Sequence, residues 1–218
     1  MSENLITKTT VWAMEIVGQY VKPGDIVIDG TMGNGHDTLA LTKLVGPDGV
    51  VIAFDVQPMA LEHTRALLEE NGVTVTTEGK AEDGYQPESG VRLILDSNAN
   101  MRSYVSTGTV DVVGGTTEGK QPEISAILFN LGYLPGGDKT VTTTREETLR
   151  AVSEAVDLVK PGGLVCAVLY SGHQQGAEEK EALLDWAKEL SPKQFHVAYI
   201  SMWNQKKCPP EILLITKK

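Results

Sequence analysis

Short apolar runs and amphipathic stretches alternate along the chain. An almost continuously apolar run, such as 50–55, is typical of a strand buried on both faces of a parallel sheet. Between these runs, apolar residues recur at helical spacing, as Leu149, Val152 and Val156 do. We therefore expect strands at 26–29, 50–55, 91–95, 124–129, 164–170, 195–201 and 211–216. The expected helices cover 7–20, 38–45, 58–71, 145–159 and 177–190.

The alternation of strands and helices predicts the fold class. Strands that are joined through a helix run parallel and place helices on both faces of their sheet. The strands expected at 195–201 and 211–216 have no helix between them, which favours an antiparallel pair. The sequence thus predicts an α/β, Rossmann-like fold with a mostly parallel seven-stranded sheet and an antiparallel C-terminal strand.

The length and the apolar content of the chain favour a single domain. With 218 residues, 41% of them hydrophobic, the chain can bury one α/β core, and we expect one domain over residues 1–218. Two polar, glycine-containing stretches near 76–90 and 106–121 each carry the sequence Thr-Thr-Glu-Gly-Lys. A five-residue repeat is too short to form a structural unit, so we expect two surface insertions.

The charge of the chain limits its partners. The formal net charge is −10 and the sequence pI is about 4.9, which argues against unspecific binding to phosphate backbones. A nucleic-acid substrate stays possible, because an acidic enzyme can carry a local basic strip. Lys139, Arg145, Lys206 and Lys207 all fall near predicted strand ends, although a lysine in a loop is more often an ordinary surface residue.

Two cysteines and the lack of long apolar runs indicate the compartment. Cys166 lies in an apolar run and Cys208 in a polar one, so we expect no disulfide framework and no metal site. The first ten residues do not resemble a signal peptide, and no run reaches transmembrane length. We expect a cytoplasmic protein without a membrane partner.

A glycine-rich segment after the first strand is typical of a nucleotide-cofactor site. Gly33 and Gly35 permit positive φ angles and a close approach of backbone N–H groups to a ligand. Asp55 closes the next strand at the distance where an acidic residue accepts hydrogen bonds from ribose hydroxyls. The segment also contributes Asp29, Asn34 and Asp37 as candidate cofactor-binding residues.

The residues of this segment favour one cofactor over another. A dinucleotide site uses Gly-x-Gly-x-x-Gly, whereas here Gly33-Asn34-Gly35 is followed by His36, Asp37 and Thr38. Carboxylates at Asp29 and Asp37 would repel a pyrophosphate but attract the sulfonium and amino groups of S-adenosylmethionine. We therefore expect S-adenosylmethionine and not NAD.

Further candidates follow the later strands, because ligands of open parallel sheets bind outside the carboxyl ends of the strands. Ser97 and Asn98 could bind an adenine edge, with Gln57 beside Asp55 on the ribose, or they could simply cap a helix. Asn130 could orient a neutral amine through its carbonyl without adding charge. The ring of Tyr133 could stack on a planar base or pack in a corner. His173 could accept a proton or only support its loop.

Three segments of the chain together resemble a known family. They are Gly30–Thr38, Phe54–Gln57 and Phe129–Lys139, of which the run 130–139 is the most specific. They resemble the Putative rRNA methylase family, whose characterised members are bacterial tRNA 5-aminomethyl-2-thiouridine methyltransferases. The resemblance extends from about Gly24 to Lys217.

The resemblance implies a class I methyltransferase fold, a tRNA substrate and a homodimer. It also implies transfer of a methyl group from S-adenosylmethionine to the aminomethyl nitrogen of a modified wobble uridine. By position in the motifs, the cofactor would be surrounded by Asn34, Asp37, Asp55, Gln57, Ser97 and Asn98, and the target base by 130–133. The residues alone leave open a small-molecule or rRNA methyltransferase of the same fold, and a non-catalytic cofactor-binding module.

Overall fold

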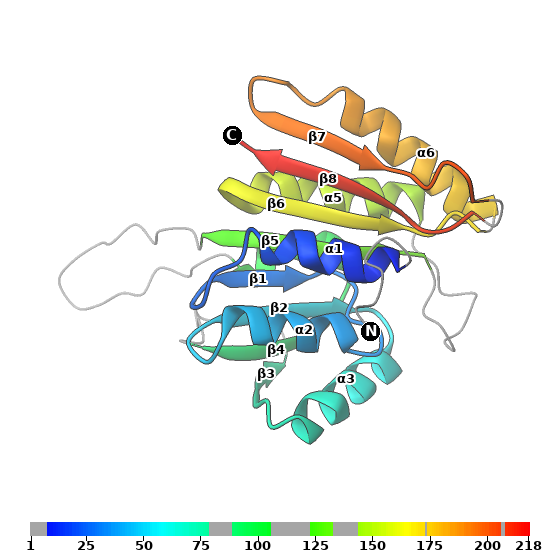
Figure 1. Ribbon diagram of the computed structural model, residues 1–218. Helices are drawn as coiled ribbons and strands as arrows, with labels where there is room; N and C mark the ends of the chain where they lie inside the picture. Colours follow the sequence, from blue (N-terminus) through cyan, green and yellow to red (C-terminus); the bar gives the residue numbers. More distant parts are fainter. Residues whose placement is uncertain (1–7, 79–88, 106–122, 133–143, 173, 206–207) are drawn as a thin grey trace.

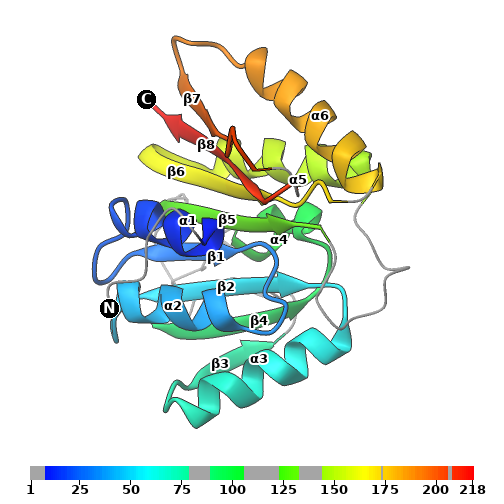
Figure 2. The same ribbon diagram turned by 45° about the vertical axis from the view of Figure 1, so that its right-hand side comes forward.

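The strands in the described part of the chain belong to one sheet, with helices packed on both of its faces (Figures 1 and 2). The computed structural model describes residues 8–78, 89–105, 123–132, 144–172, 174–205 and 208–218. The strands are β1 (Ile26–Asp29), β2 (Val50–Asp55), β3 (Val75–Glu78), β4 (Gly90–Leu95), β5 (Ile124–Leu131), β6 (Val159–Leu169), β7 (Phe195–Ile200) and β8 (Glu211–Lys217). The helices are α1 (Thr9–Gly18), α2 (His36–Val45), α3 (Pro58–Glu70), the short 3-10 helix η3 (Asn98–Asn100), α4 (Arg102–Val105), α5 (Arg145–Leu158) and α6 (Gln174–Lys188).

The strand order confirms the predicted fold and corrects the number of strands. In space the order is β3-β4-β2-β1-β5-β6-β8-β7, and only β8 runs antiparallel to its neighbours. The sheet has eight strands, one more than expected. The additional edge strand, β3, pairs with β4 and begins where the sequence predicted a surface insertion over 76–90. The second expected insertion, 106–121, lies outside the described residues.

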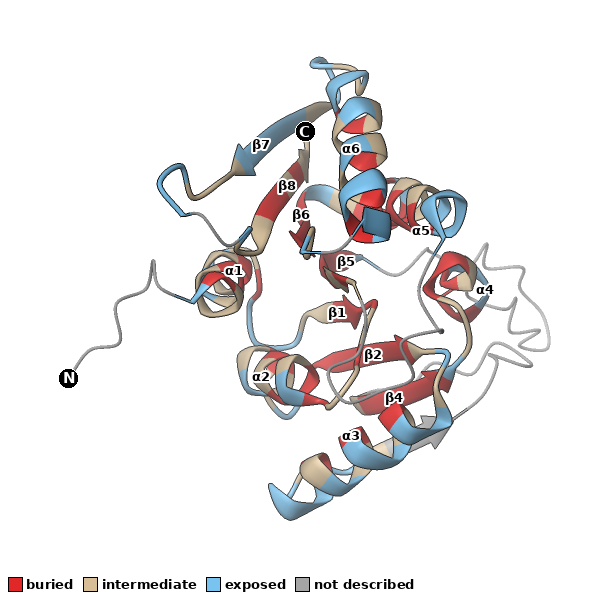
Figure 3. Cartoon of the chain, turned by 90° about the vertical axis from the view of Figure 1, so that its right-hand side faces the viewer, coloured by how far each residue is buried: buried red, intermediate tan, exposed pale blue. Residues whose placement is uncertain are grey.

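Two apolar cores hold the layers together. Adjacent residues of a strand point to opposite faces, so Val27 packs with α1, α2 and α3 while Ile28 packs with α4, α5 and α6. Figure 3 shows the buried central strands between two helical layers, while the edge strand β7 is exposed. Within the described segments, no helix combines the length and the apolar character needed to cross a membrane.

Local sequence signals set the helix ends that matter for function. Helix α5 begins with a capping box, in which Thr144 and Glu147 satisfy each other's backbone N–H groups. Helix α2 begins at His36, two residues earlier than expected, because Gly35 takes the N-cap position in a left-handed conformation (φ 81°). The strands β1, β2, β4, β5, β6 and β7 all end at one side of the sheet, which we call the carboxyl edge.

Candidate active site

The loop from Gly30 to Gly35 connects β1 to α2 at the carboxyl edge, and its backbone is fixed from several sides. The Gly30 N–H donates to the Leu128 carbonyl at 2.7 Å, and the Met32 N–H donates to the Phe54 carbonyl at 2.9 Å. The Gly35 N–H closes a turn onto the Met32 carbonyl at 2.8 Å. The loop is therefore held by both strands that flank β1, which preorganises it for a ligand.

Glycine is required at both ends of this loop. A Cβ atom on Gly30 would lie 2.4 Å from the Phe129 ring. A Cβ atom on Gly35 would lie 2.8 Å from Cα of Thr64 on α3, and the φ of Gly35 is +81°. The glycine pattern that predicted a cofactor loop thus has two physical causes here, a left-handed turn and the close packing of α3 and β5 against the loop.

Asp55, at the end of β2, faces the loop, while its predicted contact with ribose hydroxyls stays a prediction. Its Oδ2 accepts from the Gly33 N–H at 3.1 Å and its Oδ1 from the Gln57 N–H at 2.9 Å. Burial raises the pKa of this half-buried carboxyl, although the same N–H groups lower it in part. Each carboxylate oxygen has a second lone pair, so Asp55 can still accept hydrogen bonds from two vicinal hydroxyls.

Asp29, at the end of β1, is enclosed by the protein, and its expected contact with the cofactor stays a prediction. Its side chain is fully buried, and its oxygens accept from the Thr31 N–H at 3.0 Å and from the Thr38 hydroxyl at 2.6 Å. Burial, reinforced by the nearby charge of Asp37, raises the pKa of Asp29 to about 7. Asp29 therefore stabilises the loop and the start of α2 through its hydrogen bonds with Thr31 and Thr38.

This raised pKa predicts a specific pH dependence of stability. The folded protein binds the Asp29 proton more tightly than the unfolded chain, so the free energy of unfolding falls as the pH rises from about 4 to about 7. Asp29→Asn keeps one acceptor and one donor for the two threonines but cannot ionise. We expect the variant to gain on the order of 4 kcal/mol relative to wild type across this window, measured by urea denaturation at several pH values. Asp48→Asn, on the surface, controls for the lost charge, and parallel curves for Asp29→Asn and wild type would contradict the prediction.

The side chains of Asp37 and Asn130 meet at the centre of the site, although they are 93 residues apart. The Asn130 Nδ2 group, at the end of β5, donates to Asp37 Oδ2 in the first turn of α2 at 2.7 Å. The Asn130 backbone N–H donates to the Thr31 hydroxyl oxygen at 2.7 Å. Because a carboxylate only accepts, the amide nitrogen of Asn130 is committed to Asp37 and its carbonyl oxygen is left for another donor.

Burial also raises the pKa of Asp37, against the opposing effects of the Asn130 hydrogen bond and the neighbouring His36. A cationic ligand beside a carboxylate relieves this cost, since an opposite charge favours the ionised form. Asp37 and Asp55 are both half-buried and flank the same loop. The two carboxylates of the site therefore suit the cationic S-adenosylmethionine better than a pyrophosphate, as the sequence predicted.

Two residues of α3 complete the loop, and sequence reasoning missed both. The Thr64 hydroxyl donates to the Gly33 carbonyl at 3.2 Å, and His63 Nδ1 lies 3.3 Å from Asn34 Oδ1. Thr64 is fully buried and His63 is exposed. Nothing in the local sequence marks them, because their role depends on how α3 packs against a loop 29 to 31 residues away.

Ser97 and Asn98 take different positions after β4. Ser97 is the N-cap of η3, where its hydroxyl accepts from the Ala99 N–H at 3.3 Å. Asn98 is buried, and its Nδ2 donates to the Gly30 carbonyl at 2.8 Å. The capping alternative thus describes Ser97, while Asn98 ties β4 to the glycine loop.

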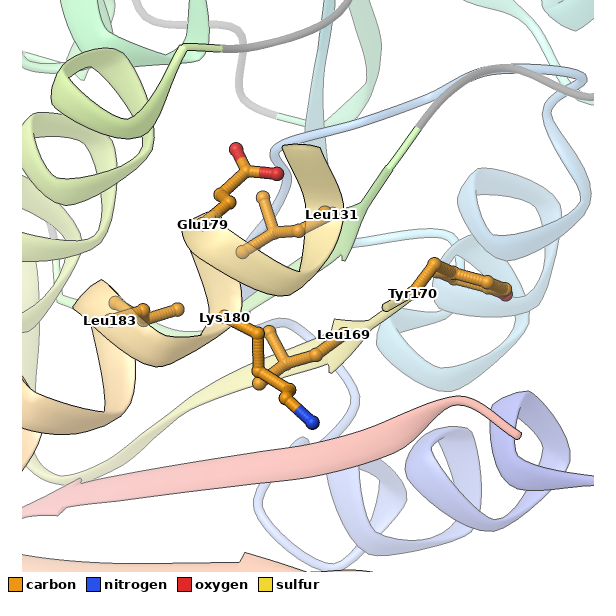
Figure 4. A pocket seen from close by; sticks show the side chains of 7 residues that line it. Leu131, Leu169, Tyr170, Glu179, Lys180 and Leu183 are labelled. Carbon is orange, nitrogen blue, oxygen red and sulfur yellow. The ribbon is translucent and has the colours of Figure 1, made fainter. Parts of the chain in front are cut away.

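A small opening lies between the ends of β5 and β6 and helix α6 (Figure 4). Leu131, Leu169 and Leu183 line it, together with Glu179, which accepts a hydrogen bond from the Thr148 hydroxyl. Tyr170 lines it too and points away from α6 in Figure 4. Burial and the charge of Asp37 raise the pKa of Tyr170, so its phenol stays neutral near the centre of the site.

The remaining candidates are only partly described. Gln57 is half-buried at the N-cap of α3, directly after the strand end that carries Asp55. Tyr133 and His173 lie outside the described residues. The structure therefore brings Gly33, Asp37, Asp55 and Asn130 together around one loop, and these residues can hold a charged ligand beside a hydrogen-bond acceptor.

The chain was compared with protein families and with solved structures. The model of the family described as Putative rRNA methylase matches residues 51–216. A chloroplastic tRNA (mnm(5)s(2)U34)-methyltransferase of Arabidopsis thaliana is 31% identical over 216 residues, which is 97% of this chain and 70% of that protein.

Two crystal structures share the whole fold. One, of a putative rRNA methylase from Clostridium thermocellum, superposes with a TM-score of 0.81 at 32% identity and covers all of both chains. The other, of a putative methyltransferase from Streptococcus mutans in complex with S-adenosylhomocysteine (SAH), gives a TM-score of 0.76 at 31% identity, again over all of both chains. The fold, the site and these similarities together show that the chain belongs to the Putative rRNA methylase family and is a class I methyltransferase that uses S-adenosylmethionine.

Proposed function

We propose that the protein methylates the aminomethyl nitrogen of 5-aminomethyl-2-thiouridine at the wobble position of tRNA. The hydrogen bond of 2.7 Å between Asn130 and Asp37 carries this proposal. It fixes an uncharged acceptor, the Asn130 carbonyl oxygen, beside a cofactor loop. Such an acceptor can bind an N–H group of an amine and leave the nitrogen lone pair free to attack.

The cofactor supplies a methyl group on a sulfonium sulfur, which the amine nitrogen takes in line while the C–S bond breaks. The residues around it have distinct proposed roles. Asp55 accepts from the ribose hydroxyls with Gln57 beside it, and the turn Gly33-Asn34-Gly35 exposes backbone toward the cofactor. Asp37 offsets the cationic charge and orients Asn130. Ser97 and Asn98 shape the adenine side.

We assign proposed roles to two residues whose placement is not described. Tyr133 follows Asn130 by three positions and would stack on the target base, since its ring offers a flat apolar face. His173 follows β6 and would take up the proton that the methylated nitrogen releases. The neutral Tyr170 and the leucines of the neighbouring opening support this proposal, because an apolar surrounding favours the uncharged amine.

The family description favours rRNA as a second candidate substrate. Mass spectrometry of nucleosides from tRNA and rRNA, in cells with and without the protein, separates the two. We expect the unmethylated aminomethyl nucleoside to accumulate in tRNA when the protein is absent. A methyl group missing from rRNA alone would refute the tRNA substrate, and unchanged nucleosides in both would leave the small-molecule alternative.

The neutral nucleophile predicts how the reaction depends on pH. With purified protein and undermethylated tRNA, the rate at limiting substrate should rise as the pH increases and the substrate ammonium loses its proton. The measurement is the initial rate of methyl transfer between pH 6 and 9. A flat profile would contradict an attack by the free amine.

We further propose that the chain works as one domain, in the cytoplasm, as a homodimer. The free cysteines Cys166 and Cys208 support a reducing compartment. Val197 and Tyr199 on the edge strand β7 are about 40% exposed and support a second copy as a partner, because a long uncovered edge strand invites pairing. Sedimentation of the purified protein as a monomer would refute the dimer.

A further inference from the structure

One large aromatic side chain stands free in the loop between β7 and β8, which we call the 201–210 loop. The side chain of Trp203 is 98% exposed. The other two tryptophans, Trp12 and Trp186, are partly buried against the two cores. Tryptophan is highly buried on average, so a fully exposed indole is a candidate for contact with another molecule.

The base of the 201–210 loop is firmly anchored. Glu211 accepts from the Ser201 hydroxyl at 2.6 Å and from Lys180 Nζ on α6 at 2.7 Å. The Thr9 hydroxyl donates to the Pro210 carbonyl at 3.1 Å, which ties the loop to α1. The Ser201 end of the loop is therefore tied to Glu211 of β8, and the other end to α1 and α6, so Trp203 projects from an anchored base.

The sheet register places this loop on the same edge as the reaction centre. Asn130 pairs with Val168, Val168 with Ile212, and Ile212 with Ile200. These four residues form one row across the sheet, so Ile200 lies three strand spacings, about 14 Å, from Asn130. The chain enters the loop directly after Ile200, at the carboxyl edge. Trp203 is thus within reach of a nucleotide close to the one at Asn130.

We propose that Trp203 stacks on an unpaired nucleobase of the tRNA beside the target nucleotide. This inference rests on the proposed function. Unpaired RNA bases are bound by stacking on aromatic rings, and stacking requires no positive charge. The mode fits a chain with a net charge of −10, in which phosphate contacts contribute less than in a basic protein. The neighbouring Asn204 and Gln205 are exposed and polar, which favours a nucleotide over a membrane or an apolar protein surface.

Three substitutions of Trp203 test the stacking. The probe is a fluorescently labelled anticodon stem-loop, with binding measured by anisotropy at constant salt. Trp203→Ala and Trp203→Leu should each weaken RNA binding about tenfold, because both remove the aromatic face. Trp203→Phe should weaken it no more than about threefold, since a smaller ring remains. All three variants should bind S-adenosylmethionine as tightly as wild type in calorimetry.

Tryptophan emission gives a second readout on the same samples. Addition of the stem-loop should quench the exposed indole of wild type, and this part of the quenching should be missing in Trp203→Phe. A double-stranded RNA of equal length should quench much less, because its bases are already stacked on each other.

The outcomes separate the inference from the function on which it rests. If Trp203→Ala binds the stem-loop like wild type while wild type methylates tRNA, the inference is wrong and the function stands. If Trp203→Leu binds as well as Trp203→Phe, the contact is apolar and not stacked, and the inference is also wrong. Loss of cofactor affinity in Trp203→Ala would overturn it too, since the ring would then support the fold. If wild type binds S-adenosylmethionine but neither binds nor methylates tRNA, both proposals fall.

Discussion

Asn130→Ala should lower the rate of methyl transfer about a hundredfold while the affinity for S-adenosylmethionine changes less than about threefold. The substitution removes the carbonyl oxygen that would position the amine. It also removes the partner of Asp37, whose Oδ2 accepts from Asn130 Nδ2 at 2.7 Å. Misplacing a nucleophile by an ångström is enough to cost this much rate. The Asn130 backbone N–H, which donates to the Thr31 hydroxyl, is kept in the variant, so we expect the loop to keep its shape.

Single-turnover rates and calorimetry together measure this effect. Asn71→Ala is a matched control. It also removes a side-chain amide, but this amide is exposed and its Nδ2 donates only to the Leu67 carbonyl at the end of α3. Asp37→Asn should have an intermediate effect, since it keeps an acceptor for Asn130 but removes the negative charge. If Asn130→Ala transferred methyl groups at the wild-type rate, the role assigned to Asn130 would have to be abandoned.

Gly35→Ala should weaken cofactor binding about a hundredfold and destabilise the protein by about 3 kcal/mol. The new Cβ would lie 2.8 Å from Cα of Thr64, a backbone atom that can move only if α3 moves. The φ of +81° adds strain of about 1 to 2 kcal/mol for any residue with a Cβ atom. A shift of α3 would also displace the Thr64 hydroxyl, which holds the Gly33 carbonyl at 3.2 Å.

Gly72→Ala separates the two causes. Its φ of +73° is similar, but no atom lies within 4 Å of the added Cβ. We therefore expect it to lose only about 1 to 2 kcal/mol of unfolding free energy and to bind the cofactor like wild type. Urea denaturation and calorimetry on both variants check this. Equal cofactor affinity in Gly35→Ala and Gly72→Ala would contradict the requirement for close packing of α3 on the loop.

Much of the fold could be predicted because single strands carry their own signal. The run 50–54 is apolar throughout and 124–129 is apolar except for Ser125, and the structure buries both between two helical layers. Strand β3 could not be predicted in this way, because Val75–Glu78 is short and largely polar at a sheet edge, where pairing with β4 decides its conformation. The predicted start of α2 was two residues too late, because a glycine such as Gly35 is more typical of a loop than of a helix N-cap.

The sequence could predict which residues lie at the strand ends of the carboxyl edge, but it could not predict which of their side chains contact one another. Topology brings Asp55 and Asn130 to one edge, and the sequence suffices to name them. Whether a carboxylate at that edge faces the ligand depends on packing, and here Asp29 is buried against Thr38 while Asp37 stays half-buried. The hydrogen bond that Asn130 donates to Asp37 joins residues far apart in the chain, and no local sequence pattern predicts it.

The antiparallel course of β8 affects how this enzyme class can diversify. Since β7 and β8 are neighbouring antiparallel strands, we expect the loop between them to tolerate changes in length and sequence as long as its anchored ends at Ser201 and Pro210 are kept. The glycine loop lies on the other half of the sheet and stays untouched by such changes. If the loop binds RNA as we propose, changes within it would alter the recognised RNA while the methyl donor stays the same.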